Sequence, residues 1–277
     1  MDTPLTARAL AFRQLHADPG CFVIPNPWDV GSARLLAGMG FKALASTGAG
    51  HAFSSGLTDG AVGRERMLAH LQQMAGATDL PLSADLENGF GPAPETVAET
   101  IRLAAATGIV GGSIEDSSGD RHAPILPLAL AAERVRAAVE AARALPFPFT
   151  LTARAENHFL GQPDLADTIR RLQAYQEAGA DVLFAPGLRT REDIAAVLSA
   201  VDRPVNVLMG LDGVTLTVAD LAAMGVKRIS VGGSFARAAY GAFLRAAREV
   251  QEHGSFSYAN EAISGRDITR LLRSPRD

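Results

Sequence analysis

Short apolar runs alternate along the chain with longer segments in which apolar residues recur every three or four positions. Four of the runs follow an alanine-rich stretch and a glycine, as at Gly108 before Ile109. Glycine just past a helix permits the left-handed turn that ends it, so these places predict a helix followed by a strand. The other four runs follow a proline or an equivalent break. Strands are therefore expected at residues 22–25, 41–45, 82–85, 109–114, 149–153, 181–184, 205–208 and 226–231.

Strands that alternate with helices over roughly residues 20–250 predict an α/β fold, a parallel (β/α)₈ TIM barrel. We expect a single domain over residues 1–277, with an N-terminal helix in 1–20 (residues 4–17), the barrel in 21–250 and a C-terminal helical extension in 251–277 (helix 259–272). An open doubly wound sheet is the alternative. It usually carries a glycine-rich phosphate loop after its first strand, whereas residues 25–29 read Pro-Asn-Pro-Trp-Asp.

Two carboxylates, Asp85 and Glu87, end the third predicted strand. Side chains two apart on a strand point to the same side, so these two leave the strand together and repel each other. A shared hard cation such as Mg²⁺, which takes oxygen ligands, would keep both ionised. The same two residues could instead cap the following loop and helix.

Further polar residues follow neighbouring strands at the same rim, where TIM barrels carry their chemistry. Four carboxylates from these strands would face one arginine, which favours the metal hypothesis over capping. The two lysines of the chain, Lys42 and Lys227, start their strands and lie at the opposite end, which disfavours Schiff-base chemistry. The four carboxylates are Asp59, Asp85, Glu87 and Glu115, the arginine is Arg154, and Glu156 follows it on the same strand end.

Composition narrows the class of protein. With 277 residues, of which 47% are hydrophobic, the chain can bury a large core. Its net charge of −4 gives no long-range attraction to nucleic acid or to an anionic membrane, so neither is expected as a partner. The N-terminus lacks a basic segment followed by an apolar core, and we expect a cytoplasmic protein. The single cysteine, Cys21, excludes a disulfide framework.

Several motifs together resemble the isocitrate lyase and phosphoenolpyruvate mutase superfamily, over nearly the whole chain. The most specific are Thr47-Gly48-Ala49, Gly56-Leu57-Thr58-Asp59, Asp85-Leu86-Glu87-Asn88-Gly89-Phe90-Gly91, Ile114-Glu115-Asp116 and Ala153-Arg154-Ala155-Glu156. The resemblance implies a TIM barrel whose last helix is exchanged with a neighbouring subunit, in a homotetramer of two such dimers. It implies Mg²⁺ bound directly by Asp85, with Asp59, Glu87 and Glu115 acting mostly through waters. Mn²⁺ accepts the same oxygen ligands. Family members more often have aspartate at the position of Glu87.

The resemblance also implies a small 2-oxo or 2-hydroxy carboxylate as substrate. One carboxylate would be held by Arg154 and by backbone N–H groups around Gly48 and Ala49. A guanidinium can grip a carboxylate with two parallel hydrogen bonds. The metal would act as a Lewis acid and stabilise the pyruvate-like enolate left when the bond at C3 breaks. The substrate-binding candidates are Thr47, Gly48, Ala49, Arg154 and Asn206.

The segment after the fourth strand, residues 116–125, departs from the family pattern. In isocitrate and methylisocitrate lyases this mobile gate carries a Lys-(Lys or Arg)-Cys-Gly-His motif whose cysteine protonates the departing enolate, and neither the lysine nor the cysteine is present here. Decarboxylation requires the fewest catalytic groups from the gate, because CO₂ leaves without a base and only the enolate must be protonated. Cleavage next to a hydroxyl group needs a base as well, for which His122, His51, Glu156 and His158 are candidates. The catalytic candidates are Arg154, Glu115, His122 and Glu156.

Three functions follow. The first is a Mg²⁺-dependent enzyme that cleaves a C–C bond of a small di- or tricarboxylate, with oxaloacetate decarboxylation preferred. The second is a lyase for a substituted malate or a methylisocitrate-like acid, in which His122 or Glu156 replaces the missing cysteine. The third is a 2-oxo-acid-binding protein that kept the metal site and lost efficient turnover.

Overall fold

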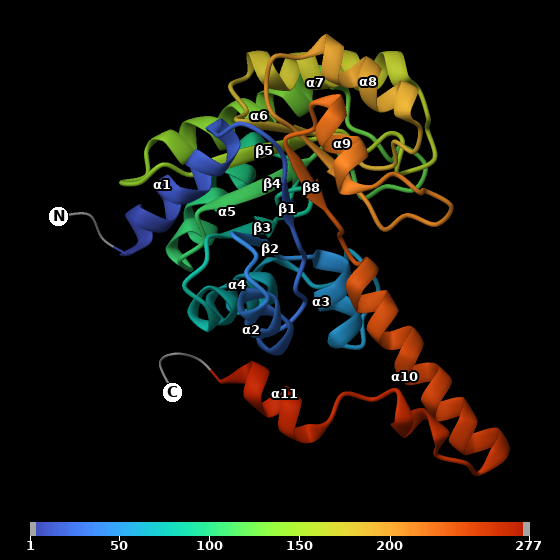
Figure 1. Ribbon diagram of the computed structural model, residues 1–277. Coiled ribbons are helices and arrows are strands. Elements are labelled where there is room, and N and C mark those ends of the chain that lie inside the picture. The colour runs from blue at the N-terminus through green and yellow to red at the C-terminus, as the bar shows by residue number, and fades with distance from the viewer. Residues whose placement is uncertain (1–3, 274–277) are drawn as a thin grey trace.

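The computed structural model describes residues 4–273, in which eight parallel strands pair in the order β1-β8-β7-β6-β5-β4-β3-β2 (Figure 1). A hydrogen bond of 3.1 Å from the Ala45 N–H to the Pro25 carbonyl joins β2 to the end of β1 and closes the barrel. The predicted TIM barrel is confirmed, and each strand lies within a few residues of its expected position. The strands are β1 (Phe22–Ile24), β2 (Leu44–Ala45), β3 (Leu82–Asp85), β4 (Gly111–Glu115), β5 (Thr150–Arg154), β6 (Val182–Phe184), β7 (Val205–Leu208) and β8 (Arg228–Ser230).

Helices cover the outside of the barrel. In α5, for example, Val97, Ile101 and Ala104 recur at three- and four-residue spacing and are fully buried, as expected for the inward face of an amphipathic helix. The outer helices are α2 (Val30–Gly38), α3 (Gly48–Ser54), α4 (Arg64–Ala77), α5 (Pro94–Ala106), α6 (Leu128–Arg143), α7 (Leu165–Glu177), α8 (Arg191–Ala200) and α9 (Val218–Met224).

Helix α1 (Pro4–Ala17) lies across the end of the barrel where the strands begin, and it confirms the helix expected there. Its Phe12 is fully buried and approaches the first residue of β4, Gly111. A Cβ atom at Gly111 would lie 2.8 Å from the Phe12 ring, so glycine permits this close approach. The opposite end of the barrel stays open for chemistry.

The chain leaves the barrel in a long helix, α10 (Ser234–His253), which extends away from the other elements (Figure 1). Only Ala236 of this helix is buried, and Phe243 is 65% exposed. The short helix α11 (Gly265–Leu272) then lies against α2. No helix in the described part of the chain is long and apolar enough to cross a membrane.

The expectation of one helix over residues 259–272 is wrong in its first half. A 3₁₀ turn, η1 (Ser257–Asn260), is followed by non-helical residues before α11 begins. The Glu249 carboxylate accepts hydrogen bonds from the Ser257 and Tyr258 N–H groups, and the Ser264 hydroxyl caps α11 by accepting from the Asp267 N–H. These local bonds divide the segment in two. Exchange of a helix between subunits stays a prediction.

Candidate active site

A cavity of about 1000 Å³ opens at the carboxyl ends of the strands and reaches into the barrel. Its walls include the last residues of β3, β4 and β5, which are Asp85, Glu115 and Arg154. The cavity brings together most of the site residues that the sequence predicts. These are Thr47, Ala49, Asp59, Asp85, Glu87, Glu115, Arg154, Glu156 and Asn206.

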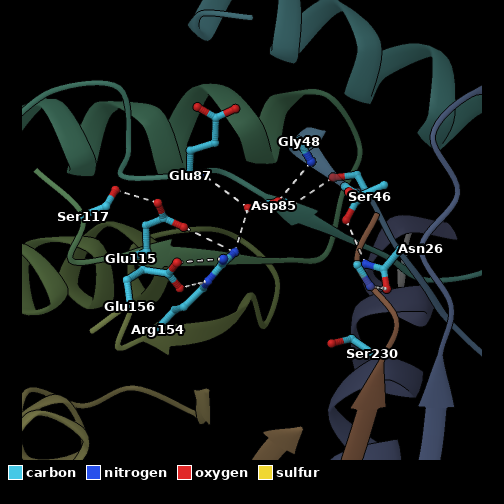
Figure 2. A network of polar contacts seen from close by, with 12 residues as sticks. Asn26, Ser46, Gly48, Asp85, Glu87, Glu115, Ser117, Arg154, Glu156 and Ser230 are labelled. Atoms are coloured by element: carbon cyan, nitrogen blue, oxygen red, sulfur yellow. Dashed lines mark hydrogen bonds and ion pairs between the residues drawn. The ribbon is translucent and has the colours of Figure 1, made fainter. Parts of the chain in front are cut away.

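Arg154 is the centre of an ion-pair network (Figure 2). Its Nε and Nη2 atoms both donate to the Glu156 carboxylate. Its Nη1 atom lies 3.3 Å from Glu115 Oε2 and 3.7 Å from Asp85 Oδ1. Burial opposes the positive charge, but Glu156, Glu115 and Asp85 outweigh that effect and raise the pKa of Arg154. The guanidinium is therefore a permanent cation, held in place by three carboxylates.

Asp85 is held at the end of β3 by backbone hydrogen bonds. Its Oδ2 accepts from the Gly48 N–H at 3.0 Å, its Oδ1 accepts from the Glu87 N–H at 3.3 Å, and its own N–H donates to the Ser46 hydroxyl at 2.9 Å. A Cβ atom at Gly48 would lie 3.0 Å from Glu87 Oε1 and 3.3 Å from Asp85 Oδ2. Two carboxylates thus lie over one glycine, which leaves room for both.

The loop after β3 has a strained backbone. Glu87 and Phe90 take φ angles of 49° and 61°, in the left-handed region that non-glycine residues rarely adopt. Arg134 of α6, a buried side chain, donates to the carbonyl groups of residues 88, 91 and 92. The Glu115 N–H donates to the Glu87 carbonyl at 3.0 Å. These bonds hold the loop in the shape that places the Glu87 side chain.

Glu87 makes no ion pair with the other described residues, and carboxylates surround it. Burial, and then Asp85, Glu115 and Asp59, raise its pKa to about 8. Burial and Asp85 likewise raise the pKa of Asp59. The Glu87 Oε1 atom is buried without a hydrogen-bond partner among the described residues. Such an atom is costly to bury unless something binds it.

Glu115 and Glu156 form hydrogen bonds with different neighbours. Glu115 accepts from the Ser117 hydroxyl at 2.6 Å, and burial raises its pKa. The Glu156 N–H donates to Asp116 at 2.8 Å, and burial raises the pKa of the Glu156 carboxyl against the opposing effect of Arg154. Asp116 points away from the cavity and pairs with Arg171 at 3.0 Å. Asp116 therefore supports the wall rather than facing a ligand.

A divalent cation fits this set of donors. The site has more carboxylates than cations, and the unsatisfied Glu87 oxygen lies beside Gly48, as Asp85 Oδ2 does. Within residues 4–273, however, no three His, Cys, Asp or Glu side chains converge closely enough to form a direct ligand set. Mg²⁺ usually keeps several waters and takes one or two carboxylates from the protein.

The inner end of the cavity is polar as well. The Asn206 amide donates to the Ser230 hydroxyl at 2.9 Å and accepts from Arg228 Nε at 2.9 Å. Sequence reasoning missed Arg228 and Ser230. The signal was available, because they stand two apart in the expected strand, with Ile229 between them, and so share one face.

The gate segment forms a short hairpin over the mouth. Ser117 pairs with Ile125, and the Ser118 N–H donates to the Pro124 carbonyl at 2.8 Å. His122 is exposed and does not line the cavity, whereas its neighbour Arg121 does. The structure therefore does not bring His122 to the other candidates, although it brings Glu156 there.

Comparison with known proteins places this geometry in context. The family model described as phosphoenolpyruvate phosphomutase matches residues 12–251. An uncharacterized protein of Mycobacterium tuberculosis is 33% identical over 88% of this chain and 90% of its own. A 2-methylisocitrate lyase of Bacillus subtilis is 28% identical over 88% of this chain and 82% of its own. An oxaloacetate decarboxylase of Rhodopseudomonas palustris is 30% identical over 73% of this chain and 68% of its own.

Two solved structures have the same fold as this chain. A protein of Burkholderia cenocepacia J2315, described only as a lyase/mutase, is 59% identical with a TM-score of 0.97 over 99% of both chains. Oxaloacetate acetylhydrolase in complex with oxalate is 27% identical, with a TM-score of 0.87 over 98% of this chain and 95% of its own.

Proposed function

Because the chain belongs to the phosphoenolpyruvate phosphomutase family, whose members are lyases and mutases, we propose that it is a Mg²⁺-dependent C–C lyase for a small 2-oxo or 2-hydroxy di- or tricarboxylate. Oxaloacetate decarboxylation is the preferred activity. The observation that carries the proposal is the fixed Arg154 surrounded by Asp85, Glu115 and Glu156 at the mouth of the barrel.

Asp85 would hold the metal directly, with Asp59, Glu87 and Glu115 around it. Mg²⁺ bound there would supply Lewis-acid stabilisation of negative charge on the substrate oxygen. The chain's own contribution is orientation. The Gly48 N–H holds the Asp85 carboxylate, the Ser46 hydroxyl holds the Asp85 backbone N–H, and Arg134 holds the loop that carries Glu87. Mn²⁺ would fit the same oxygen ligands.

Arg154 would bind a substrate carboxylate at its end-on edge, once Nη1 exchanges its ion pairs with Glu115 and Asp85 for the substrate. Its Nε and Nη2 atoms form the side-on pair with Glu156. The outer hydrogens of Nη1 and Nη2 still form an end-on fork that can grip a carboxylate with two parallel bonds. The N–H groups near Gly48 and Ala49 would assist, after the Gly48 N–H exchanges its bond to Asp85 for one to substrate.

In the preferred reaction the C3–C4 bond of oxaloacetate breaks, CO₂ leaves, and the electron pair stays on the enolate of pyruvate. A proton then adds at C3. Burial raises the pKa of the Glu156 carboxyl against the opposing effect of Arg154, and Glu156 would deliver this proton. Glu115, held by the Ser117 hydroxyl, is the neighbouring candidate. His122 would take part only if the gate hairpin closes.

A lyase acting on a substituted malate or on methylisocitrate is the second candidate. It is favoured by the cavity, which at about 1000 Å³ is far larger than a four-carbon acid needs. A 2-oxo-acid-binding protein with little turnover is the third, motivated by the altered gate.

Assembly is proposed on separate grounds. Exposed apolar side chains on α10, such as Phe243 at 65% and Leu244 at 47%, support exchange of the C-terminal helices within a dimer and a homotetramer of two such dimers. The cytoplasmic location expected from the sequence stays a prediction.

The test is a substrate panel. Purified protein with Mg²⁺ is incubated with oxaloacetate, methylisocitrate, dimethylmalate or phosphonopyruvate, with and without EDTA, and 2-oxo acid products are followed by NMR. EDTA-sensitive pyruvate from oxaloacetate, above the metal-only rate, supports decarboxylation. Turnover of the hydroxy acids alone moves the assignment to the lyase. Mg²⁺-dependent binding without products supports the binding protein.

A further inference from the structure

Arg228 places a buried positive charge at the inner end of the cavity. It begins β8, is 5% exposed, and lines the cavity together with Asn206 and Ser230. Its guanidinium donates to Asn206 Oδ1 at 2.9 Å and to Thr152 Oγ1 at 3.0 Å, and it lies 3.3 Å from His16 Nε2. A guanidinium has five N–H donors, so these three contacts leave two available.

All three partners of Arg228 are neutral. His16 Nδ1 lies 2.9 Å from the Phe12 carbonyl, so Nδ1 carries the proton and Nε2 is the acceptor that faces Arg228. Burial, and then Arg228, lower the pKa of His16 to about 3, which keeps the ring uncharged.

Among the other buried arginines, Arg154 and Arg171 have acidic partners, whereas Arg134 donates to three backbone carbonyl groups. Arg154 pairs with Glu156 and Glu115, and Arg171 pairs with Asp116 and Asp167. No ion pair joins Arg228 to a carboxylate within residues 4–273, and burial lowers its pKa to about 9. Buried charges are normally paired, so this one is open to an anion from outside the chain.

The interior of the barrel gives an anion a path to Arg228. TIM barrels usually fill this space with bulky branched side chains, but here Ser83 and Ser113 line the cavity between its mouth and Arg228. Thr152, which contacts Arg228, precedes Arg154 by two residues on the same face of β5, a distance of about 6.6 Å along the strand. A ligand held at Arg154 that extends by a few carbon atoms therefore reaches Arg228.

We propose that Arg228, with Asn206 and Ser230, forms a second anion subsite that binds a distal carboxylate of the substrate. This proposal rests on the proposed function, because it takes the first carboxylate to lie at Arg154. The Ser230 hydroxyl accepts from Asn206 and so keeps its own proton to donate to the anion.

The subsite also restricts the reaction. A carboxylate held by a guanidinium is stabilised as an anion, which opposes its loss as CO₂. The group at Arg228 is therefore one that the product keeps. Oxaloacetate keeps a single carboxylate after decarboxylation, so the subsite favours the second candidate, a lyase for a substituted malate or a methylisocitrate-like acid with a further carboxylate beyond C3.

Three probes of different reach test the subsite by calorimetric titration in Mg²⁺. 2-Oxoglutarate has a distal carboxylate, 2-oxovalerate has a methyl group in its place, and oxalate is too short to reach Arg228. The wild-type protein should bind 2-oxoglutarate at least about tenfold more tightly than 2-oxovalerate, since charge-assisted hydrogen bonds are strong. R228M should remove this difference in affinity between the two longer probes, called the margin below. Its affinity for oxalate should stay within about twofold of the wild-type value.

The control variant is H16Q, which replaces a contact of the Arg228 guanidinium that does not line the cavity. It should keep the margin between the two longer probes even if it lowers stability. If R228M does not fold, the affinities of the wild-type protein test the proposal alone. Equal wild-type affinities for 2-oxoglutarate and 2-oxovalerate overturn it. A margin that survives in folded R228M also overturns it.

Oxalate binding distinguishes a failure of the Arg228 subsite from a failure of the proposed function. If oxalate binds in a Mg²⁺-dependent way while the margin is absent, only the Arg228 subsite fails. If oxalate does not bind while 2-oxoglutarate binds through Arg228, the proposed function fails and the subsite stands. If no probe binds, both are wrong.

Discussion

Replacing Gly48 with alanine should separate the stability of the fold from the function of the site. The new Cβ would lie 3.0 Å from Glu87 Oε1 and 3.3 Å from Asp85 Oδ2. Contacts this short require the carboxylates to move by a few tenths of an ångström. Gly48 begins α3 and does not have a positive φ, so alanine fits the backbone there.

The two effects of G48A have opposite signs. Alanine in place of glycine in a helix should raise the free energy of unfolding by about 0.5–1 kcal/mol. Displacing groups that orient metal ligands typically costs about 10–100-fold in metal affinity or activity. The variant should therefore be as stable as the wild type or slightly more so, and bind Mg²⁺ with oxalate much more weakly.

Gly76 offers a matched control. It lies in α4, its φ is not positive, and a Cβ atom added there would meet no described residue within 4 Å apart from the adjoining backbone of its own helix. G76A should gain the same helix stability and keep wild-type ligand binding. Urea unfolding of metal-free protein and calorimetric titration with Mg²⁺ and oxalate measure both quantities. Wild-type affinity in G48A would refute the placement of Asp85 and Glu87 at the metal.

Three further changes test other parts of the structure. R154K should raise KM for the carboxylate substrate by about tenfold or more, because an ammonium group cannot form the end-on fork; unaltered KM and kcat would make Arg154 structural. His16 has a folded pKa of about 3, below its unfolded value of 6.5, so its stabilising contribution is complete above pH 6.5 and is lost as the pH falls. Between pH 7 and pH 5 the difference in unfolding free energy between wild type and H16Q should shrink by about 2 kcal/mol, and a constant difference in urea titrations would show that folding does not lower the pKa of His16. R134M should loosen residues 88–92, measured as faster amide exchange there, and weaken Mg²⁺ binding while secondary structure by circular dichroism stays unchanged; unaltered exchange would show that the loop holds itself.

Much of the barrel could be predicted because its helices and strands are separated by glycine and proline. The predicted rim carboxylates line one cavity because residues two apart on a strand share a face, which also explains why Glu156 joins Arg154. Asp116 is one residue from Glu115 and therefore points into the wall. The same rule applied to β8 would have found Arg228.

Other features depend on contacts that the sequence pattern does not contain. The left-handed backbone at Glu87 is held by Arg134, which lies 47 residues further along the chain. The break between η1 and α11 depends on side-chain caps from Glu249 and Ser264. The position of His122 depends on how the gate hairpin folds, which motif matching does not describe.

The rate of pyruvate formation from oxaloacetate, compared between wild-type protein and D85A at the same Mg²⁺ concentration, tests the central claim most directly. Asp85 is the expected direct ligand, and its carboxylate accepts hydrogen bonds from the Gly48 and Glu87 N–H groups. We predict a rate above the metal-only background for the wild type, abolished by EDTA, and no rate above background for D85A. Equal rates in the two proteins would contradict a metal-dependent lyase centred on Asp85.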